Sequence, residues 1–185
     1  MPAPDQFERL EKLLSTPSLP DLGPNRRPEA KPVSQLDHAL AEIFRGTDLS
    51  DDAKGVIRAA IYLWHDHLGE SHRLAQEIHT RDGGFVHGLM HRREPDYSNA
   101  AYWFRRVGEH DCFAGLHAAA SKFLAGRDEM LLTRLIPNGG WDPFAFIRLC
   151  EEAETSPKWR TILRELQKFE MEALLRTVWR RQTSK

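Results

Sequence analysis

The chain has 185 residues, is 41% hydrophobic and 29% charged, and carries 26 basic against 27 acidic side chains. This composition is typical of a folded domain and argues against wholesale disorder. The net charge of -1 argues against a strongly basic nucleic-acid-binding protein, and no charge-free run approaches the roughly 20 residues of a membrane-spanning helix. We therefore expect no nucleic-acid partner and no membrane partner.

The N-terminal part differs from the rest of the chain. Residues 5–14 place apolar side chains at helical spacing, which predicts a short amphipathic helix. Five of the eleven prolines then fall within sixteen residues, and proline at that density fixes φ and removes backbone donors. Residues 15–34 are therefore predicted to form an extended strap. We interpret residues 1–34 as a short helix with a proline-rich linker, and residues 35–185 as a helical domain.

From residue 35 onward the apolar pattern has helical spacing throughout. Gly46 ends the first helix, and the next one, capped by Ser50, continues or bends near Gly69. Asp82-Gly83-Gly84 is typical of a turn. Further helices are expected over residues 85–92, 97–107, 113–124, 128–135, 143–151 and 157–180. Because no alternating strand pattern is found, the predicted fold class is all-α, a single orthogonal or irregular helical bundle with an N-terminal proline-rich strap.

The stretch HGLMHRREPDYSNAAYWFRRVGEH concentrates the polar chemistry of the chain. Its first two histidines, His87 and His91, are four residues apart and share one face of a helix. A second helix, which begins after a proline, brings carboxamide, aromatic and guanidinium groups onto its own face. Arginine matches carboxylate or phosphate, and tryptophan or tyrosine faces suit a sugar or a planar ring. The candidate ligand-binding residues are His72, His87, Arg92, Arg93, Asp96, Asn99, Tyr102, Trp103 and Arg106.

The resulting hypothesis is a protein that binds a small polar or anionic molecule in a cleft lined by histidine, arginine and tryptophan. Arg93 or Arg106 holds the anion, and Trp103 stacks on the ligand. His91 and Glu94 form the candidate catalytic pair for proton transfer, as in a hydrolase or a lyase.

The same residues also fit a purely structural interpretation, in which arginines pair with nearby acids and hold the helices at a fixed angle. The arginines are Arg92, Arg93, Arg105 and Arg106, and the acids are Glu94, Asp96 and Glu109. The protein is then a non-enzymatic interaction module, and its proline-rich strap and basic last helix meet a partner. A homodimer stays open as well.

A third interpretation is a metal-dependent enzyme. The candidate ligands are His65, His72, His79, His87 and His91, which would suit zinc, iron or manganese. However, the His-x₃-His pair lacks the acid of the zinc proteases, and the chain has no Glu-x-x-His pair of the di-iron bundles. Two His-Asp dipeptides, as in the HD-type enzymes, leave an HD-like phosphohydrolase as an alternative. The sequence assigns no metal ligand, and the cofactor stays unknown.

The cysteines and the N-terminus bear on the compartment of the protein. Cys112 and Cys150 lie in apolar, helix-like surroundings, which predicts buried thiols rather than a disulfide or a metal site. His110 precedes Cys112 by two residues, and residues two apart on a helix point away from each other, so no Cys–His nucleophile is expected. The N-terminus carries acids early and lacks the apolar run of a secretory signal. We expect a cytoplasmic protein.

Three strings of the chain resemble a family of uncharacterised bacterial and fungal all-helical proteins. They are WHDH-x₂-ESH-x₃-Q, HGLMHRREPDYSNAAYWFRRVGEH and GGWDPFAFIRLCE, and the resemblance spans roughly Trp64 to Glu152. The resemblance implies no established activity, substrate or cofactor. It does imply that residues 141–144 belong to the same functional unit as the histidine-rich strings.

Overall fold

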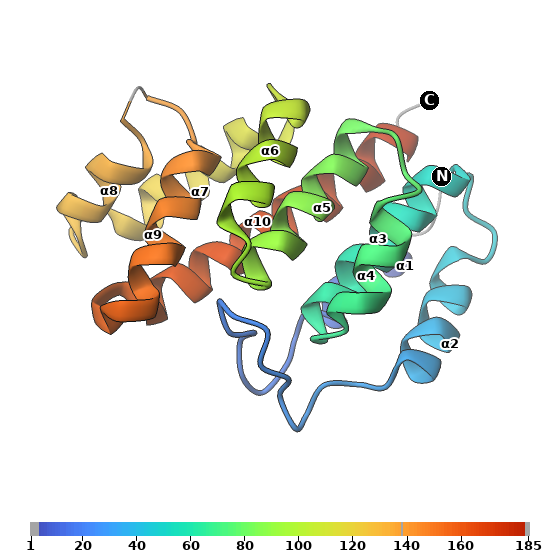
Figure 1. Ribbon diagram of the computed structural model, residues 1–185. Helices are drawn as coiled ribbons and strands as arrows, with labels where there is room; N and C mark the ends of the chain where they lie inside the picture. Colours follow the sequence, from blue (N-terminus) through green and yellow to red (C-terminus); the bar gives the residue numbers. More distant parts are fainter. Residues whose placement is uncertain (1–3, 138, 184–185) are drawn as a thin grey trace.

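The computed structural model describes residues 4–137 and 139–183 and is drawn in Figure 1. These residues form ten α-helices and one 3₁₀ turn and contain no strand, which confirms the all-α prediction. The helices are α1 (Pro4–Lys12), α2 (Val33–Phe44), α3 (Asp51–Trp64), α4 (Leu68–Ala75), α5 (Arg81–Arg93), α6 (Tyr97–Val107), α7 (Cys112–Leu124), α8 (Glu129–Leu135), α9 (Pro143–Thr155) and α10 (Arg160–Thr183), with the 3₁₀ turn η1 at Pro157–Trp159. None of these helices is both long enough and apolar enough to cross a bilayer.

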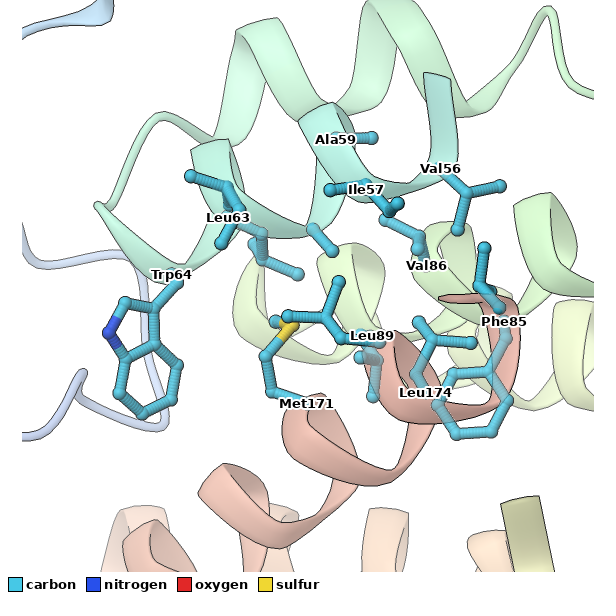
Figure 2. Packing of buried hydrophobic residues seen from close by; sticks show 14 of the residues in the cluster. Val56, Ile57, Ala59, Leu63, Trp64, Phe85, Val86, Leu89, Met171 and Leu174 are labelled. Carbon is cyan, nitrogen blue, oxygen red and sulfur yellow. The ribbon is translucent and has the colours of Figure 1, made fainter. Parts of the chain in front are cut away.

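Two apolar clusters hold the helices together. In the first, α3 packs against both α5 and α10. Figure 2 shows Leu63 of α3, Leu89 of α5 and Met171 of α10 gathered in this cluster. The second cluster joins α7, α8 and α9 to the first half of α10. Burial of this apolar surface is the main favourable term in folding, so the two clusters set where the polar helix faces end up.

α5 lies between α4 and α6 and packs against both of them (Figure 1). The approach of α6 is close because Gly88 has no side chain. A Cβ atom at Gly88 would lie 2.8 Å from the ring of Phe104 on α6. This contact keeps the two helices that carry most of the predicted site residues in a fixed arrangement.

The turn predicted at Asp82-Gly83-Gly84 is wrong, because these residues form the first turn of α5. Thr80 caps the helix, and its Oγ1 accepts a hydrogen bond of 3.1 Å from the backbone N–H of Gly83. A Cβ atom at Gly83 would lie 2.3 Å from the carbonyl oxygen of Ile78. Glycine is therefore needed here for close packing of the chain, and it does not interrupt the helix.

α3 and α4 are separate helices. α3 ends at Trp64, Asp66 adopts a left-handed backbone conformation with φ of 63°, and α4 begins at Leu68. The break therefore precedes Gly69. It also means that His65, His72 and His79 do not share one continuous helical face.

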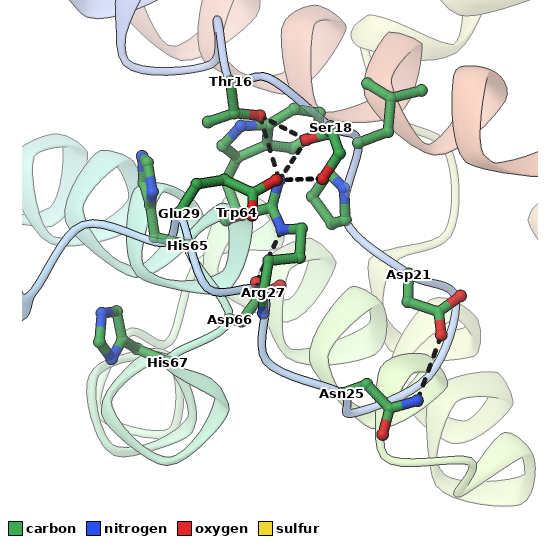
Figure 3. A network of polar contacts seen from close by, with 12 residues as sticks. Thr16, Ser18, Asp21, Asn25, Arg27, Glu29, Trp64, His65, Asp66 and His67 are labelled. Carbon is green, nitrogen blue, oxygen red and sulfur yellow. Dashed lines mark hydrogen bonds and ion pairs between the residues drawn. The ribbon is translucent and has the colours of Figure 1, made fainter.

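The N-terminal segment packs into the same core as the rest of the chain. Leu10 of α1 is fully buried in the first apolar cluster. The strap that follows is extended, and α2 begins at Val33. Arg27 of the strap is buried, and its Nε donates to Asp66 Oδ2 at 2.7 Å (Figure 3). The strap is thus fastened over the connection between α3 and α4.

Candidate metal centre

Three histidine side chains converge between α4 and α5. His72 comes from α4, while His87 and His91 are one turn apart on α5 and share the face that α4 covers. Each residue offers one ring nitrogen such that the three atoms all lie within 4.8 Å of one another. Among the described residues this is the one group of three or more histidine, cysteine or carboxylate side chains that comes so close together.

The spacing of the rings is near that of a metal site. The ring centroids are 4.9 Å apart for His72 and His87, 5.1 Å for His72 and His91, and 4.9 Å for His87 and His91. A zinc ion binds imidazole nitrogen at about 2.0–2.1 Å, which places two such nitrogens of a tetrahedral site about 3.4 Å apart. Side-chain rotations that move the nitrogens by about 1 Å would therefore complete the three ligands.

The polar partners of His91 orient its ring. Glu94, the C-cap residue of α5, places a carboxylate oxygen 3.4 Å from His91 Nδ1. The carboxamide nitrogen of Asn99 lies 3.1 Å from His91 Nε2. Asp96 in turn caps α6 by accepting from the backbone N–H of Asn99 at 3.1 Å, which holds Asn99 in place. A carboxylate on one nitrogen of a histidine fixes the ring and raises the basicity of the other nitrogen.

His87 has a different environment. It is 3% exposed, and the indole of Trp103 stacks on it with ring centroids 3.9 Å apart and an interplanar angle of 18°. Its Nδ1 atom is buried and has no hydrogen-bond partner among the described residues. A buried polar atom without a partner costs free energy, and coordination to a metal ion would satisfy it.

The cluster favours neutral imidazoles. Burial, together with the neighbouring charges of His91 and His72, lowers the pKa of His87 to about 4. Burial and the charge of His72 lower the pKa of His91, against the opposing effect of Glu94 and Asp96. Both rings are therefore neutral at pH 7, and neutral imidazole is the form that binds metals.

The structure does not bring Arg92 and Arg93 to the three histidines. Arg92 is fully buried and makes a two-pronged contact with Glu170 of α10, at 3.0 and 2.5 Å. Arg93 Nη2 donates to Asp66 at 2.8 Å, and its Nη1 donates to the carbonyl of Leu63 at 2.5 Å. Both arginines hold helices together, as the structural interpretation expects, but their acidic partners come from outside the stretch that carries them.

The remaining predicted ligand residues lie on α6. Trp103 faces the histidines, whereas Tyr102 is 45% exposed. The guanidinium of Arg106 lies over both rings, 5.6 Å from the Trp103 centroid and 5.8 Å from that of Tyr102. In the described part of the chain no carboxylate lies within 4.0 Å of Arg106 or of Arg105, so the pairing expected for these two is not present.

The other candidate metal ligands are used for different contacts. His65 contacts Leu13 O, just after α1, at 2.9 Å, and accepts from the backbone N–H of Lys31 in the strap at 3.2 Å. Burial raises the pKa of a carboxyl group, but hydrogen bonds from Arg27 and the charge of Arg93 keep the pKa of Asp66 below its ordinary value. The His65-Asp66 dipeptide therefore belongs to the buried polar network that holds the strap, and it is separate from the three histidines.

His110 and Cys112 are in contact, contrary to the sequence argument. Sγ of Cys112 lies 3.0 Å from Nδ1 of His110, because His110 precedes α7 and does not lie on it. The other ring nitrogen of His110 is 2.8 Å from Asp82 Oδ1. Cys112 is only 2% exposed, and burial raises the pKa of its thiol. An inaccessible neutral thiol is a poor nucleophile, so this arrangement ties α5 to α7.

Comparison of the chain with protein-family models, with curated proteins and with solved structures found no match. The functional argument therefore depends on the geometry of the three histidines and their surroundings.

Proposed function

We propose that the protein is a metal-dependent enzyme that binds one divalent transition metal through His72, His87 and His91. Its substrate is a small polar or anionic molecule, and hydrolysis is the reaction class that we favour. The observation that carries this proposal is the convergence of three imidazole nitrogens within 4.8 Å of one another.

The donor set suits zinc first. Three histidines with a fourth position open to water or substrate are a common catalytic zinc arrangement, and imidazole also suits copper, nickel and iron. The unpartnered Nδ1 of His87 and the carboxylate beside His91 support the metal over a simple stack of histidines.

The bound metal would supply Lewis acidity, which polarises a carbonyl or phosphoryl oxygen and lowers the pKa of water. Glu94 is the candidate for proton transfer, because its side chain is 37% exposed and still lies 3.4 Å from the ring of His91. A metal bound at His91 Nε2 would replace the contact that this atom makes with the carboxamide nitrogen of Asn99, at 3.1 Å, and would leave that carboxamide to hydrogen-bond a substrate. In this proposal His91 becomes a ligand, and the proton-transfer role passes to Glu94 alone. We place the enzyme in the cytoplasm.

A metal-free acid–base site is the second candidate. The contact between His91 and Glu94 favours it, because a histidine beside a carboxylate is a common proton-transfer pair. The two candidates differ in the role of His72. The metal-dependent enzyme needs His72 as a metal ligand, whereas the metal-free acid–base site does not need it.

The test is a titration of the untagged, metal-stripped protein with cobalt(II), followed by visible absorption, together with elemental analysis of the protein as purified. We expect one equivalent of metal with the spectrum of a four-coordinate site. His72→Ala should weaken binding by more than the about 10- to 100-fold typical for loss of an outer partner of a ligand. His38→Ala is the matched control, because His38 is an exposed histidine of α2.

The proposal is wrong if the wild-type protein binds cobalt no more tightly than His72→Ala does. Circular dichroism of both variants is the control for the fold, and we expect the spectrum of the wild-type protein. His72 is only partly buried, so its truncation leaves no large cavity.

A further inference from the structure

A cavity of about 330 Å³ lies beside Trp103, the residue whose indole stacks on His87. It lies between the connection from α4 to α5 and the last turns of α6, and the lining residues that matter here are His79, Thr80, Arg81, Gly84, Trp103 and Arg106. Trp103 belongs to both places, because its indole lines the cavity and also stacks on His87. The cavity is therefore next to the proposed metal centre.

We propose that this cavity binds an oxyanion group, carboxylate or phosphate, of the substrate that reacts at the metal centre. The inference rests on the proposed function and names the class of substrate for it. The substrate is a small organic acid or organic phosphate whose anionic group is separate from the bond that reacts.

The charge of the cavity carries the argument. Arg81 and Arg106 contribute two guanidinium groups, and the lining contains no aspartate or glutamate. Among the described residues, Arg81 donates a hydrogen bond only to the backbone carbonyl of Glu109, at 3.4 Å. Arg106 lies over the rings of Tyr102 and Trp103 and donates to the hydroxyl of Tyr102, at 3.4 Å. Neither arginine has a carboxylate within 4.0 Å among the described side chains, in contrast to the paired Arg92 and Arg93. Guanidinium groups free of a carboxylate are suited to bind the oxygens of an incoming anion.

The N-terminus of α5 adds to the positive potential. Thr80, its N-cap residue, lines the cavity, and the first turn of a helix carries a partial positive charge that favours anions. Asp82 is the acid of this turn, but its carboxylate is turned to His110 and Arg181, at 2.8 and 2.7 Å. Its charge is therefore compensated on the other side of the helix.

The position of the cavity along α5 sets the length of the substrate. Gly84 precedes His87 by three residues, which corresponds to about 4.5 Å along a helix axis. An oxyanion held above Gly84 would thus lie about one helical turn from the metal ligands, and Trp103 lies beside both places. The volume is near the lower end of the about 300–1,000 Å³ of small-molecule sites, which fits a substrate of a few carbon atoms.

The test uses inorganic phosphate and acetate as probes of the metal-free 185-residue chain, with the indole N–H signal of Trp103 followed by NMR. We expect saturable binding of at least one probe, and the stronger one identifies the oxyanion. Arg106→Gln should weaken that binding by about 10- to 100-fold, the usual effect of losing a charge-assisted hydrogen bond. The control is Arg105→Gln, because Arg105 is exposed on α6 but lines the separate cavity toward α7.

The inference is overturned if neither probe binds the wild-type protein. It is also overturned if binding is unchanged both in Arg106→Gln and in the double variant with Arg81→Gln. Cobalt binding distinguishes the metal centre from the oxyanion cavity, because the Arg106→Gln variant should still bind one equivalent of cobalt. A protein that binds the probe but no metal refutes the proposed function and leaves the oxyanion cavity standing.

Discussion

The buried ion pair between Arg92 and Glu170 offers a sharp test of how this protein uses its arginines. Both side chains are fully buried, they contact each other at 3.0 and 2.5 Å, and Phe146 lies 4.3 Å below the guanidinium carbon. Removal of one partner from such a pair leaves a buried charge without compensation and typically costs about 3–5 kcal/mol. Arg92→Met should therefore lower the free energy of unfolding by about that amount. For a chain of this size the melting temperature would fall by about 6–20 °C.

The double variant Arg92→Met/Glu170→Met should recover most of that loss, because an apolar pair of similar volume replaces the ion pair. Urea unfolding followed by circular dichroism measures both variants, and the coupling free energy between the two positions should be at least about 2 kcal/mol. Cobalt and phosphate binding should be unchanged below the melting temperature. If Arg92→Met is instead as stable as wild type and binds the anion more weakly, Arg92 is a ligand-binding residue and the structural argument is refuted.

Three further predictions concern the metal, the helix packing and the pH dependence. Removal of the metal with a chelator should lower the melting temperature, because metal at about 100 times its dissociation constant stabilises the folded state by about 2.7 kcal/mol. Identical melting curves for the metal-loaded and the chelated protein would contradict this. Gly88→Ala should destabilise by about 1–3 kcal/mol, because its Cβ would lie 2.8 Å from the Phe104 ring, whereas Gly69→Ala, with no atom within 4 Å, should be neutral or stabilising in the same urea titration. Burial lowers the pKa of His65 to about 4, so between this value and about 6.5 the unfolded chain binds a proton at His65 and the folded protein does not. The stabilisation is present above the ordinary value of about 6.5 and is lost as the pH falls toward 4, by at most about 1.4 kcal/mol per pH unit; His65→Gln should flatten that slope, and an identical slope would count against the assignment.

Much of the local structure was predictable because the interactions that set it join residues close in the chain. Ser50 caps α3, as its position before an apolar run indicates. His87 and His91 share a face because four residues make about one turn. Their proximity to each other was therefore expected from spacing alone.

The position of the third histidine, His72, could not be predicted from spacing. His72 reaches the pair only because the chain breaks at Asp66 and α4 then packs against α5. The sequence named His72 among several histidines, with His65 and His79 as equal candidates for a metal. Only the fold separates them, since His65 faces the strap and His79 lines the neighbouring cavity.

The arginines show most clearly what the sequence could not predict. Arg92, Arg93 and Arg106 have the same chemistry in the sequence, yet the first two are buried in ion pairs and the third is exposed beside Trp103. Glu170 lies 78 residues from Arg92, and Asp66 lies 27 residues from Arg93. The sequence by itself determined most of the helices and the pairs of side chains one turn apart, because these depend on contacts between residues up to four apart. The tertiary structure decided which polar side chains bind each other and which face the site, because burial and ion pairing depend on helices that meet only when the chain has folded.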